Sequence, residues 1–388
     1  MRYPGYILKR KAEDLFIFPF VLAGRLLAIL VPLKRRYRSF FFFPFYHTGG
    51  AEQVHAQIAK AAGGEDCIVF FTRKSKDTRF LELFKNSGCT IADISRYTDN
   101  RWLYFLNLIW RGRISHYINK QEIPTVVLNG QCNFGYKISP WLRRGIRQVE
   151  LIHSFNTFSW IRIPFLPFIT ATVMISRVRI EQHLEQYRRL GIPKSFDARI
   201  SYIPNAIELP GRSCQKQFEQ KPRVLFVGRG TKEKRPEIFI EMARQNPGLD
   251  FTAAGAIPGH LLSAKPSNLE CLGNIDNPDE LHEIYCAHHI LVIPSSTEGF
   301  PMVLMEAMAR GCAVMATPVG DIPYHIQPST GWLFSSTDAL VLLAEAKQWF
   351  SGLSPARLSA MSASAVDYAN ENFGIDRFNR QYRAILQP

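Results

Sequence analysis

Short apolar runs recur along the first half of the chain, and polar stretches that contain glycine separate them. Four of these runs read as buried strands, at residues 40–43, 67–71, 125–129 and 149–153. A glycine-containing turn and a helix over residues 50–62 follow the first run. Strands that alternate with helical segments in this way predict parallel βαβ units.

The same alternation starts again in the second half. Apolar runs at residues 224–227, 250–254, 290–293 and 313–316 read as strands, and residues 301–310 read as a helix. A polar stretch at residues 211–222 is the predicted linker. The chain is therefore predicted to be an α/β protein with two Rossmann-like, doubly wound domains. Ligands of such sheets bind beyond the carboxyl ends of the strands, so two domains facing a central cleft would hold a ligand between them.

Residues 1–38 follow a different pattern, with an apolar stretch at 15–33 between two basic clusters. The stretch is interrupted by Pro19, Gly24, Arg25 and Pro32. An arginine at the bilayer centre costs at least about 2.5–3.5 kcal/mol, which disfavours a membrane span. We expect instead a segment that lies on an anionic membrane surface, where each basic residue adds about 1 kcal/mol. The alternative is a helix packed on the protein's own core.

Charge is distributed unevenly over the 388 residues. The chain carries a formal net charge of +14, but residues 1–200 hold 31 Lys and Arg against 14 Asp and Glu. The remaining residues hold 16 against 19. This asymmetry predicts that the first half meets an anionic partner, which could be a membrane surface, an acidic substrate or a nucleic acid.

Seven cysteines are scattered along the chain without any C-x-x-C pair. This odd, irregular set predicts neither a disulfide framework nor a zinc site, and it fits a reduced compartment. The N-terminal region has no small-residue cleavage site after its apolar run, so no secretory signal is expected.

Two segments carry the candidate chemistry. Residues 295–306 follow a predicted strand and contain Glu298, a proline suited to the first turn of a helix, and Glu306. Acidic side chains can accept hydrogen bonds from sugar hydroxyls, and the amides at a helix start favour a phosphate. Residues 224–236 form a strand and a glycine turn with Arg229 and Lys234, two cations suited to a pyrophosphate.

Together these segments resemble the family 4 retaining glycosyltransferases of the GT-B fold, over about residues 40–373. Five further pieces match in the same order, at residues 47–52, 151–154, 174–176, 202–207 and 331–334. The resemblance implies an acceptor domain at residues 39–208 after the segment 1–38. It also implies a donor domain at 209–375, and a C-terminal helix at 376–388 that packs back on the N-terminal domain.

The resemblance also implies roles for individual residues. Arg229 and Lys234 would neutralise the donor's diphosphate, Glu306 would accept from ribose hydroxyls, and Glu298 with His153 would form the catalytic pair at the transferred sugar. The full donor-binding set is Gly49, Gly50, Arg229, Lys234, Glu298, Gly299, Phe300, Pro301, Met302, Val303 and Glu306. Two departures put loop shapes in doubt: Arg235 stands where the family often has glycine, and residues 319–324 replace a glycine pair usually followed by glutamate.

The implied activity is the retaining transfer of a hexose-type sugar from a nucleotide-sugar donor. The acceptor would be a saccharide or a lipid-linked saccharide, in the synthesis of bacterial cell-envelope polysaccharide or glycolipid. No cofactor and no metal is expected. Aromatic and basic stretches at 101–113, 141–144 and 158–165 favour peripheral attachment to the inner face of the cytoplasmic membrane.

Two alternatives come from other classes of protein. One is a non-catalytic or differently specialised GT-B protein that binds sugar nucleotides, such as an epimerase or a phosphorylase. The other is a basic nucleic-acid-binding protein, although the sequence contains no recognisable DNA or RNA module and no nucleic-acid partner is expected.

Overall fold

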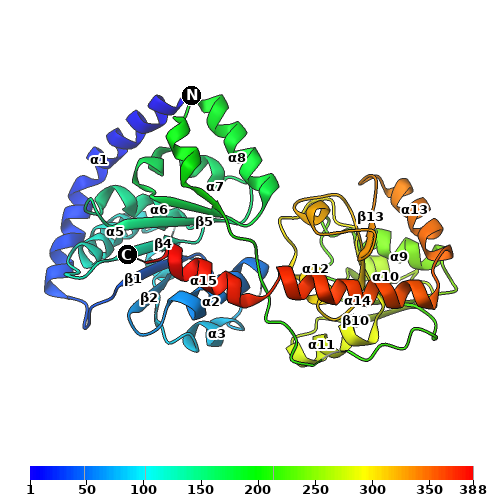
Figure 1. Cartoon of the computed structure of the whole chain (residues 1–388). Helices are drawn as coiled ribbons and strands as arrows, with labels where there is room; N and C mark the ends of the chain where they lie inside the picture. The colour runs from blue at the N-terminus through cyan, green and yellow to red at the C-terminus, as the bar shows by residue number, and fades with distance from the viewer. Residues whose placement is uncertain (48, 101, 213, 388) are drawn as a thin grey trace. The chain divides into compact units, whose positions relative to one another are not determined.

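The computed structural model describes all residues except 48, 101, 213 and 388, and it divides into two compact units. The first unit comprises Met1–Pro204 together with Asp376–Pro388, and the second comprises Asn205–Ile375. Each unit is built on its own parallel sheet (Figure 1). Three residues of the predicted motifs and linker, Thr48, Arg101 and Ser213, lie outside the described residues.

The first sheet has seven parallel strands in the order β3-β2-β1-β4-β5-β6-β7. Their bounds are β1 Ser39–Phe43, β2 Cys67–Phe71, β3 Thr90–Asp93, β4 Val126–Asn129, β5 Arg147–Ile152, β6 Ala171–Met174 and β7 Ile200–Tyr202. The central strand β1 is buried along its whole length, as expected for a strand with both faces covered. The winding direction reverses between β1 and β4, which is the switch point of a doubly wound sheet.

Helices cover both faces of this sheet. Their bounds are α1 Tyr3–Leu30, α2 Gly50–Ala62, α3 Leu81–Lys85, α4 Ser95–Thr98, α5 Tyr104–Asn119, α6 Asn133–Ile138, α7 Phe158–Ile161, α8 Arg177–Leu190 and α15 Ile375–Ile385. Short 3₁₀ helices occupy η1 Ser139–Trp141, η2 Ile163–Phe168 and η3 Lys194–Arg199. The C-terminal helix α15 contacts the first unit: Arg383 Nε donates to Ala61 O at 2.7 Å, and Arg147 Nε donates to Ile385 O at 2.9 Å (Figure 1).

The second sheet has six parallel strands in the order β10-β9-β8-β11-β12-β13. They are β8 Arg223–Val227, β9 Asp250–Ala254, β10 Leu269–Gly273, β11 Ile290–Ile293, β12 Ala313–Ala316 and β13 Gly331–Leu333. Counted within the unit, this is the order 3-2-1-4-5-6 of dinucleotide-binding Rossmann sheets, with the switch point between β8 and β11. The predicted fold class, two Rossmann-like parallel-sheet domains, is confirmed.

Two apolar cores lie on the two faces of the second sheet. The covering helices are α9 Pro236–Gln245, α10 Gly259–Leu262, α11 Pro278–Ala287, α12 Met302–Met308, α13 Ala339–Ser351 and α14 Pro355–Asn372, with the 3₁₀ helix η4 Ile322–Tyr324. The irregular cysteines gave no expectation of a disulfide, yet Cys214 and Cys286 form one. The two cysteines are 72 residues apart in sequence, so the sequence did not indicate that they pair. Only the folded sheet and α11 bring them together.

Helix α1 corrects one expectation from the sequence. Pro19 and Gly24 do not break the apolar stretch, because α1 is a single helix that runs through both. Gly24 instead allows a close crossing with α5: a Cβ there would lie 1.9 Å from Ile109 O. Arg25 donates to Trp141 O at 3.4 Å and lies over the Trp141 ring. The helix therefore packs on the protein along one face.

The opposite face of α1 is apolar and exposed. Leu15 and Phe16 are 79% and 80% exposed, and most of the apolar side chains between Phe18 and Leu30 are also in solvent. Among the described residues, no helix combines the length and apolarity needed to cross a bilayer.

The helix crossing at Gly24 predicts the effect of a substitution. In Gly24→Ala, the added methyl would meet backbone atoms of α5 that cannot rotate away, so we expect a loss of about 1–3 kcal/mol in the free energy of unfolding of the first unit. Gly5→Ala in the same helix is the control, because its Cβ would meet only the flexible Met1 side chain. Urea unfolding measures both; equal stability of the two variants would contradict the close crossing.

Candidate functional site

The candidate site of the second unit lies where β8 and β11 end, at the switch point of the sheet. The loop after β8 and the loop after β11 are joined there, since Ser296 N donates to Glu233 O at 2.8 Å. Because ligands of doubly wound sheets bind at this edge, the two loops are the place where the predicted chemistry should gather.

An ion pair connects the two loops. Lys234 Nζ lies 2.6 Å from Glu298 Oε1, and the two side chains are 23% and 8% exposed. Ser295 Oγ donates to the same carboxylate oxygen at 2.7 Å, and Thr317 Oγ1 in turn donates to Ser295 O at 2.7 Å. The structure thus brings together two predicted site residues from different motifs and fixes the carboxylate of Glu298.

Arg229 is placed differently from Lys234. Its side chain is 76% exposed and lies 4.0 Å from Glu233 Oε1. Because an exposed ion pair of this length contributes little to stability, the Arg229 side chain is available to a ligand. Lys234 is held in the site by Glu298, whereas Arg229 extends into solvent at its margin.

Arg235 explains the first departure from the family pattern. Its φ is +55°, in the left-handed region that favours glycine, and it precedes α9 as the N-cap residue. The loop therefore keeps the conformation that glycine would allow, at a cost of about 1–2 kcal/mol. The Arg235 side chain offsets part of this cost by donating to Thr337 O at 2.6 Å.

The segment from Gly299 to Val303 is anchored by Phe300. The ring of Phe300 is buried and stacked on His325 with centroids 4.4 Å apart, and its carbonyl accepts from Asn205 Nδ2 at 3.0 Å. Pro301 is the N-cap with extended backbone, so helix α12 starts at Met302, one residue later than predicted. Pro301 has no amide hydrogen, and the amides of Met302 and Val303 are the first ones in the helix.

The second departure, residues 319–324, supports the same loop. Gly320 has φ +59°, and a Cβ there would lie 2.3 Å from Gly299 O and 2.6 Å from Glu298 O. Asp321 N donates to Gly299 O at 2.9 Å. The close approach therefore requires glycine at this position, and the loop with the changed sequence still packs beneath Glu298.

Glu306 has a partner that the sequence did not reveal. Tyr285 OH, on α11, donates to Glu306 Oε2 at 3.0 Å. Burial raises the pKa of Glu306, and the hydrogen bond from Tyr285 partly opposes this shift. Arg310 Nη1 also donates to the Glu306 backbone oxygen at 3.0 Å. Tyr285 lies on a different element from the motif, so only the fold could identify it.

In the first unit, His153 follows β5 and faces His55 of α2. The two Nε2 atoms lie 2.9 Å apart, so one donates and the other accepts. Burial lowers the pKa of His153 to about 4, and burial, with the neighbouring His153, also lowers the pKa of His55. Both rings are therefore neutral at pH 7 and act as hydrogen-bonding groups rather than cations. His55 was missed in the sequence, where it reads as one residue of an amphipathic helix.

Two further features define this edge of the first sheet. Gly49 is the N-cap of α2, and a Cβ there would lie 2.2 Å from Glu52 Oε2, whereas a Cβ at Gly50 would meet open space. Gln131 has φ +59°, its Oε1 accepts from His153 N at 3.2 Å, and its Nε2 donates to Ser154 O at 3.1 Å. Left-handed backbone at a non-glycine residue is uncommon and has no sequence signature, so Gln131 was not predicted.

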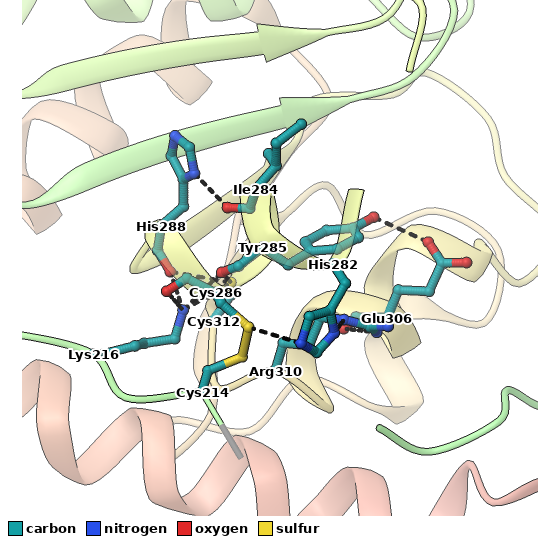
Figure 2. Close-up of a disulfide and its surroundings, with 10 residues drawn as sticks. All are labelled: Cys214, Lys216, His282, Ile284, Tyr285, Cys286, His288, Glu306, Arg310 and Cys312. Carbon is teal, nitrogen blue, oxygen red and sulfur yellow. Dashed lines mark hydrogen bonds between the residues drawn. A yellow bond between two sulfur atoms is a disulfide. The ribbon is translucent and has the colours of Figure 1, made fainter. Parts of the chain in front are cut away.

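One group of side chains in the described part of the chain has the spacing of a metal site: Cys214, His282 and Cys286. As the structure stands, the two sulfurs are bonded to each other and do not provide two thiolates. This group lies beside Tyr285 (Figure 2).

Part of the second unit matches a known protein family. Residues 221–350 match the family model described as glycosyl transferases group 1. This range contains β8, the Lys234–Glu298 pair and Glu306, so the second unit carries a glycosyl transferases group 1 domain.

The sequence relatives include D-inositol 3-phosphate glycosyltransferases. The protein of that name from Segniliparus rotundus is 28% identical over 242 residues, which cover 55% of this chain and 52% of the relative. The one from Nocardia farcinica is 26% identical over 273 residues, covering 59% of each chain. The chain thus spans about half the length of the first of these relatives.

Solved structures resemble the whole fold. HepE from Anabaena, solved with UDP and glucose, has a TM-score of 0.72 at 16% identity, covering 90% of this chain and 99% of that one. The lipopolysaccharide outer core galactosyltransferase WaaB has a TM-score of 0.68 at 15% identity, covering 89% of this chain and 98% of that one. These likenesses establish the fold, which is that of the GT-B glycosyltransferases.

Proposed function

We propose that this protein is a retaining glycosyltransferase of family 4 that transfers a hexose-type sugar from a nucleotide-sugar donor. The observation that carries the proposal is the Lys234–Glu298 pair, which a cation-bearing loop and an acidic loop form at the switch point of a glycosyl transferases group 1 domain. The HepE structures, solved with UDP and glucose and with UDP-glucose, support a nucleoside diphosphate sugar as the donor.

The two cations and the backbone amides of the site would bind the donor's diphosphate. Lys234 has three N–H donors, so it can keep Glu298 in place and also donate to a phosphate oxygen. Arg229 would approach the diphosphate from the solvent side, and its planar group suits two oxygens at once. The amides of Met302 and Val303, with the backbone of Gly299 to Pro301, would line the donor. Together these groups would stabilise the diphosphate as it leaves, and no metal or cofactor is required in the proposal.

Glu298 and Glu306 would hold the donor at its two ends. Glu298 accepts hydrogen bonds already from Ser295 and Lys234, so a sugar hydroxyl would meet a fixed carboxylate. Glu306, oriented by Tyr285, would accept from the ribose hydroxyls. The C1–O bond to the diphosphate breaks and the acceptor hydroxyl attacks from the same face. The leaving phosphate oxygen then takes the acceptor's proton, and this sequence gives retention.

The first unit would bind the acceptor, which we propose to be a saccharide or lipid-linked saccharide of the bacterial cell envelope. His153, held neutral and hydrogen-bonded to His55, would bond a sugar hydroxyl, and Gly49 and Gly50 would leave space beside it. WaaB, a lipopolysaccharide outer core galactosyltransferase, supports an acceptor of this chemistry.

The donor assignment predicts the loss of activity in single variants. In Lys234→Gln and in Glu298→Gln we expect release of nucleoside diphosphate from UDP-glucose, or from whichever nucleotide sugar the wild type consumes, to fall about 10²–10³-fold, the usual effect of removing one group that stabilises developing charge. Lys221→Gln is the matched control, because Lys221 pairs with Asp250 at the amino ends of β8 and β9, the opposite edge of the same sheet. Full turnover in both site variants would refute the assignment.

The exposed face of α1 supports peripheral binding to an anionic membrane, and we propose it as the surface that brings the enzyme to a lipid-linked acceptor. Leu15 and Phe16 on α1 are apolar groups in solvent, and so is Trp102, which precedes α5. The basic residues Lys9 and Lys34 are exposed near the two ends of the same helix. A surface that combines exposed apolar and basic groups complements a bilayer interface with anionic headgroups. The proposed location is therefore the inner face of the cytoplasmic membrane.

Membrane binding can be tested with vesicles of phosphatidylglycerol and phosphatidylcholine. We expect the wild type to sediment with anionic vesicles at moderate salt, and the double variant Leu15→Gln, Phe16→Gln to bind at least about tenfold more weakly, since two buried apolar side chains contribute several kcal/mol. Leu340→Gln is the control, because Leu340 is 77% exposed on the second unit. A wild type that ignores anionic vesicles would contradict the proposal.

A further inference from the structure

A disulfide links two segments of the second unit, and one of its cysteines is adjacent in sequence to Tyr285, the partner of the proposed ribose-binding residue Glu306 (Figure 2). Cys214 lies in the irregular segment before β8, Cys286 lies in the last turn of α11, and their Cα atoms are 5.1 Å apart. Both side chains are half-buried, whereas Cys312 nearby is fully buried. The two linked residues are therefore partly open to solvent.

His282 points its ring at the disulfide. His282 Nε2 is 3.4 Å from Cys286 Sγ, and Arg310 Nε donates to His282 Nδ1 at 2.9 Å (Figure 2). Because arginine can only donate, Nδ1 accepts, and the proton of the neutral ring lies on Nε2, facing the sulfur. This N–H stabilises a thiolate at Cys286. The same arrangement opposes metal binding, which would need a lone pair on Nε2.

The same helix orients Glu306. Tyr285 is adjacent to Cys286 on α11, and its hydroxyl donates to Glu306 Oε2 at 3.0 Å. Arg310, the partner of His282, also donates to Glu306 O at 3.0 Å. Tyr285 thus links the position of α11 to the carboxylate proposed to bind ribose, whereas the Arg310 contact reaches only the backbone of Glu306.

Lys216 forms a second link between the Cys214 segment and the end of α11. Its Nζ donates to Tyr285 O at 2.8 Å, to Cys286 O at 3.2 Å and to His288 O. A cation that satisfies the last carbonyls of a helix stabilises the end of that helix. Because this second link remains, breaking the sulfur–sulfur bond would loosen the last turn of α11 locally rather than unfold the unit.

We propose that Cys214 and Cys286 form a reversible thiol–disulfide exchange site that reacts with dithiols, and that its state sets the affinity for the nucleoside diphosphate through Tyr285 and Glu306. The effect on nucleoside diphosphate affinity rests on the proposed function, whereas the exchange chemistry does not. The intact disulfide holds α11 where Tyr285 orients Glu306, so the oxidised state is the one with the higher affinity.

The exchange proceeds in two balanced steps. A thiolate of the dithiol attacks Cys214 Sγ, the sulfur–sulfur bond breaks, and Cys286 leaves as a thiolate that accepts the hydrogen bond from His282. The second thiolate of the dithiol then attacks its own mixed disulfide, closes the cyclic disulfide of the reagent and releases Cys214. Two electrons pass from the dithiol to the protein, and each protein thiolate takes a proton from the medium or stays ionised.

The test measures sulfur chemistry and nucleotide binding separately on the full chain. Dithiothreitol is added without denaturant, the protein is alkylated, and mass spectrometry reports the labelling of Cys214 and Cys286. Calorimetry then measures UDP binding in the oxidised, reduced and reoxidised protein. We expect complete reduction under native conditions and at least an about fivefold weaker UDP affinity, the lower end of typical coupling between sites. Reoxidation should restore the affinity.

Three variants separate the parts of the proposal. Tyr285→Phe should bind UDP equally in both redox states, because the contact with Glu306 is lost. His282→Gln should be reduced more slowly, because the leaving thiolate loses its hydrogen bond. The oxidised protein should keep its UDP affinity, because the contact between Tyr285 and the Glu306 carboxylate does not involve His282. Cys271→Ser, which removes a free half-buried thiol of the same unit, should behave as the wild type.

Several results would overturn the proposal. A bond that resists dithiothreitol until urea is added would be a structural crosslink. Equal UDP affinity in the oxidised and reduced states would refute the claim that the disulfide regulates the donor site. If UDP binds in neither state, the control fails together with the proposed function, but native reduction still decides the exchange site. One Zn²⁺ per reduced chain, lost in Cys214→Ser, would replace the exchange site with a metal centre.

Discussion

The ion pair between Lys234 Nζ and Glu298 Oε1, at 2.6 Å, joins two loops that follow different strands of the second sheet. Parallel β8 and β11 end side by side at the switch point, so their loops meet although 64 residues separate the two charges. The Glu298 side chain is only 8% exposed, and removing its partner would leave a poorly solvated charge at a cost of roughly 1–3 kcal/mol. The proposed donor site depends on this one contact.

Much of the fold follows from the sequence alone. The bounds of β2, β9, β11, β12 and α2 agree with the predicted runs, because buried parallel strands and an amphipathic helix have clear patterns. The predicted start of α12 was wrong by one residue, because Pro301 serves as the N-cap and the helix begins at Met302. The prediction that Pro19 and Gly24 interrupt the apolar stretch was also wrong, because tertiary packing against α5 overrides their local helix-breaking preferences.

Less of the site could be predicted. Motifs identified Lys234, Glu298 and Glu306 but not what they contact, because Ser295 and Tyr285 reach them only after the sheet forms. The left-handed backbone at Arg235 preserves a loop whose sequence departs from the family pattern. The same limit applies to the His55–His153 pair and to the disulfide, which join elements far apart in sequence. Local sequence patterns predict helices and strands, whereas the hydrogen-bond and ion-pair partners of polar side chains depend on how the sheet brings distant segments together.

Hydrogen exchange of the full chain, with and without saturating UDP-glucose, tests the central claim most directly. The account predicts slower amide exchange in residues 228–235 and 295–303, the two loops that the Lys234–Glu298 pair joins, because the bound diphosphate would order both. The amino edge of the same sheet, residues 219–223, should exchange as before. Saturable binding that leaves both loops unchanged, or protects only the amino edge, would contradict the account.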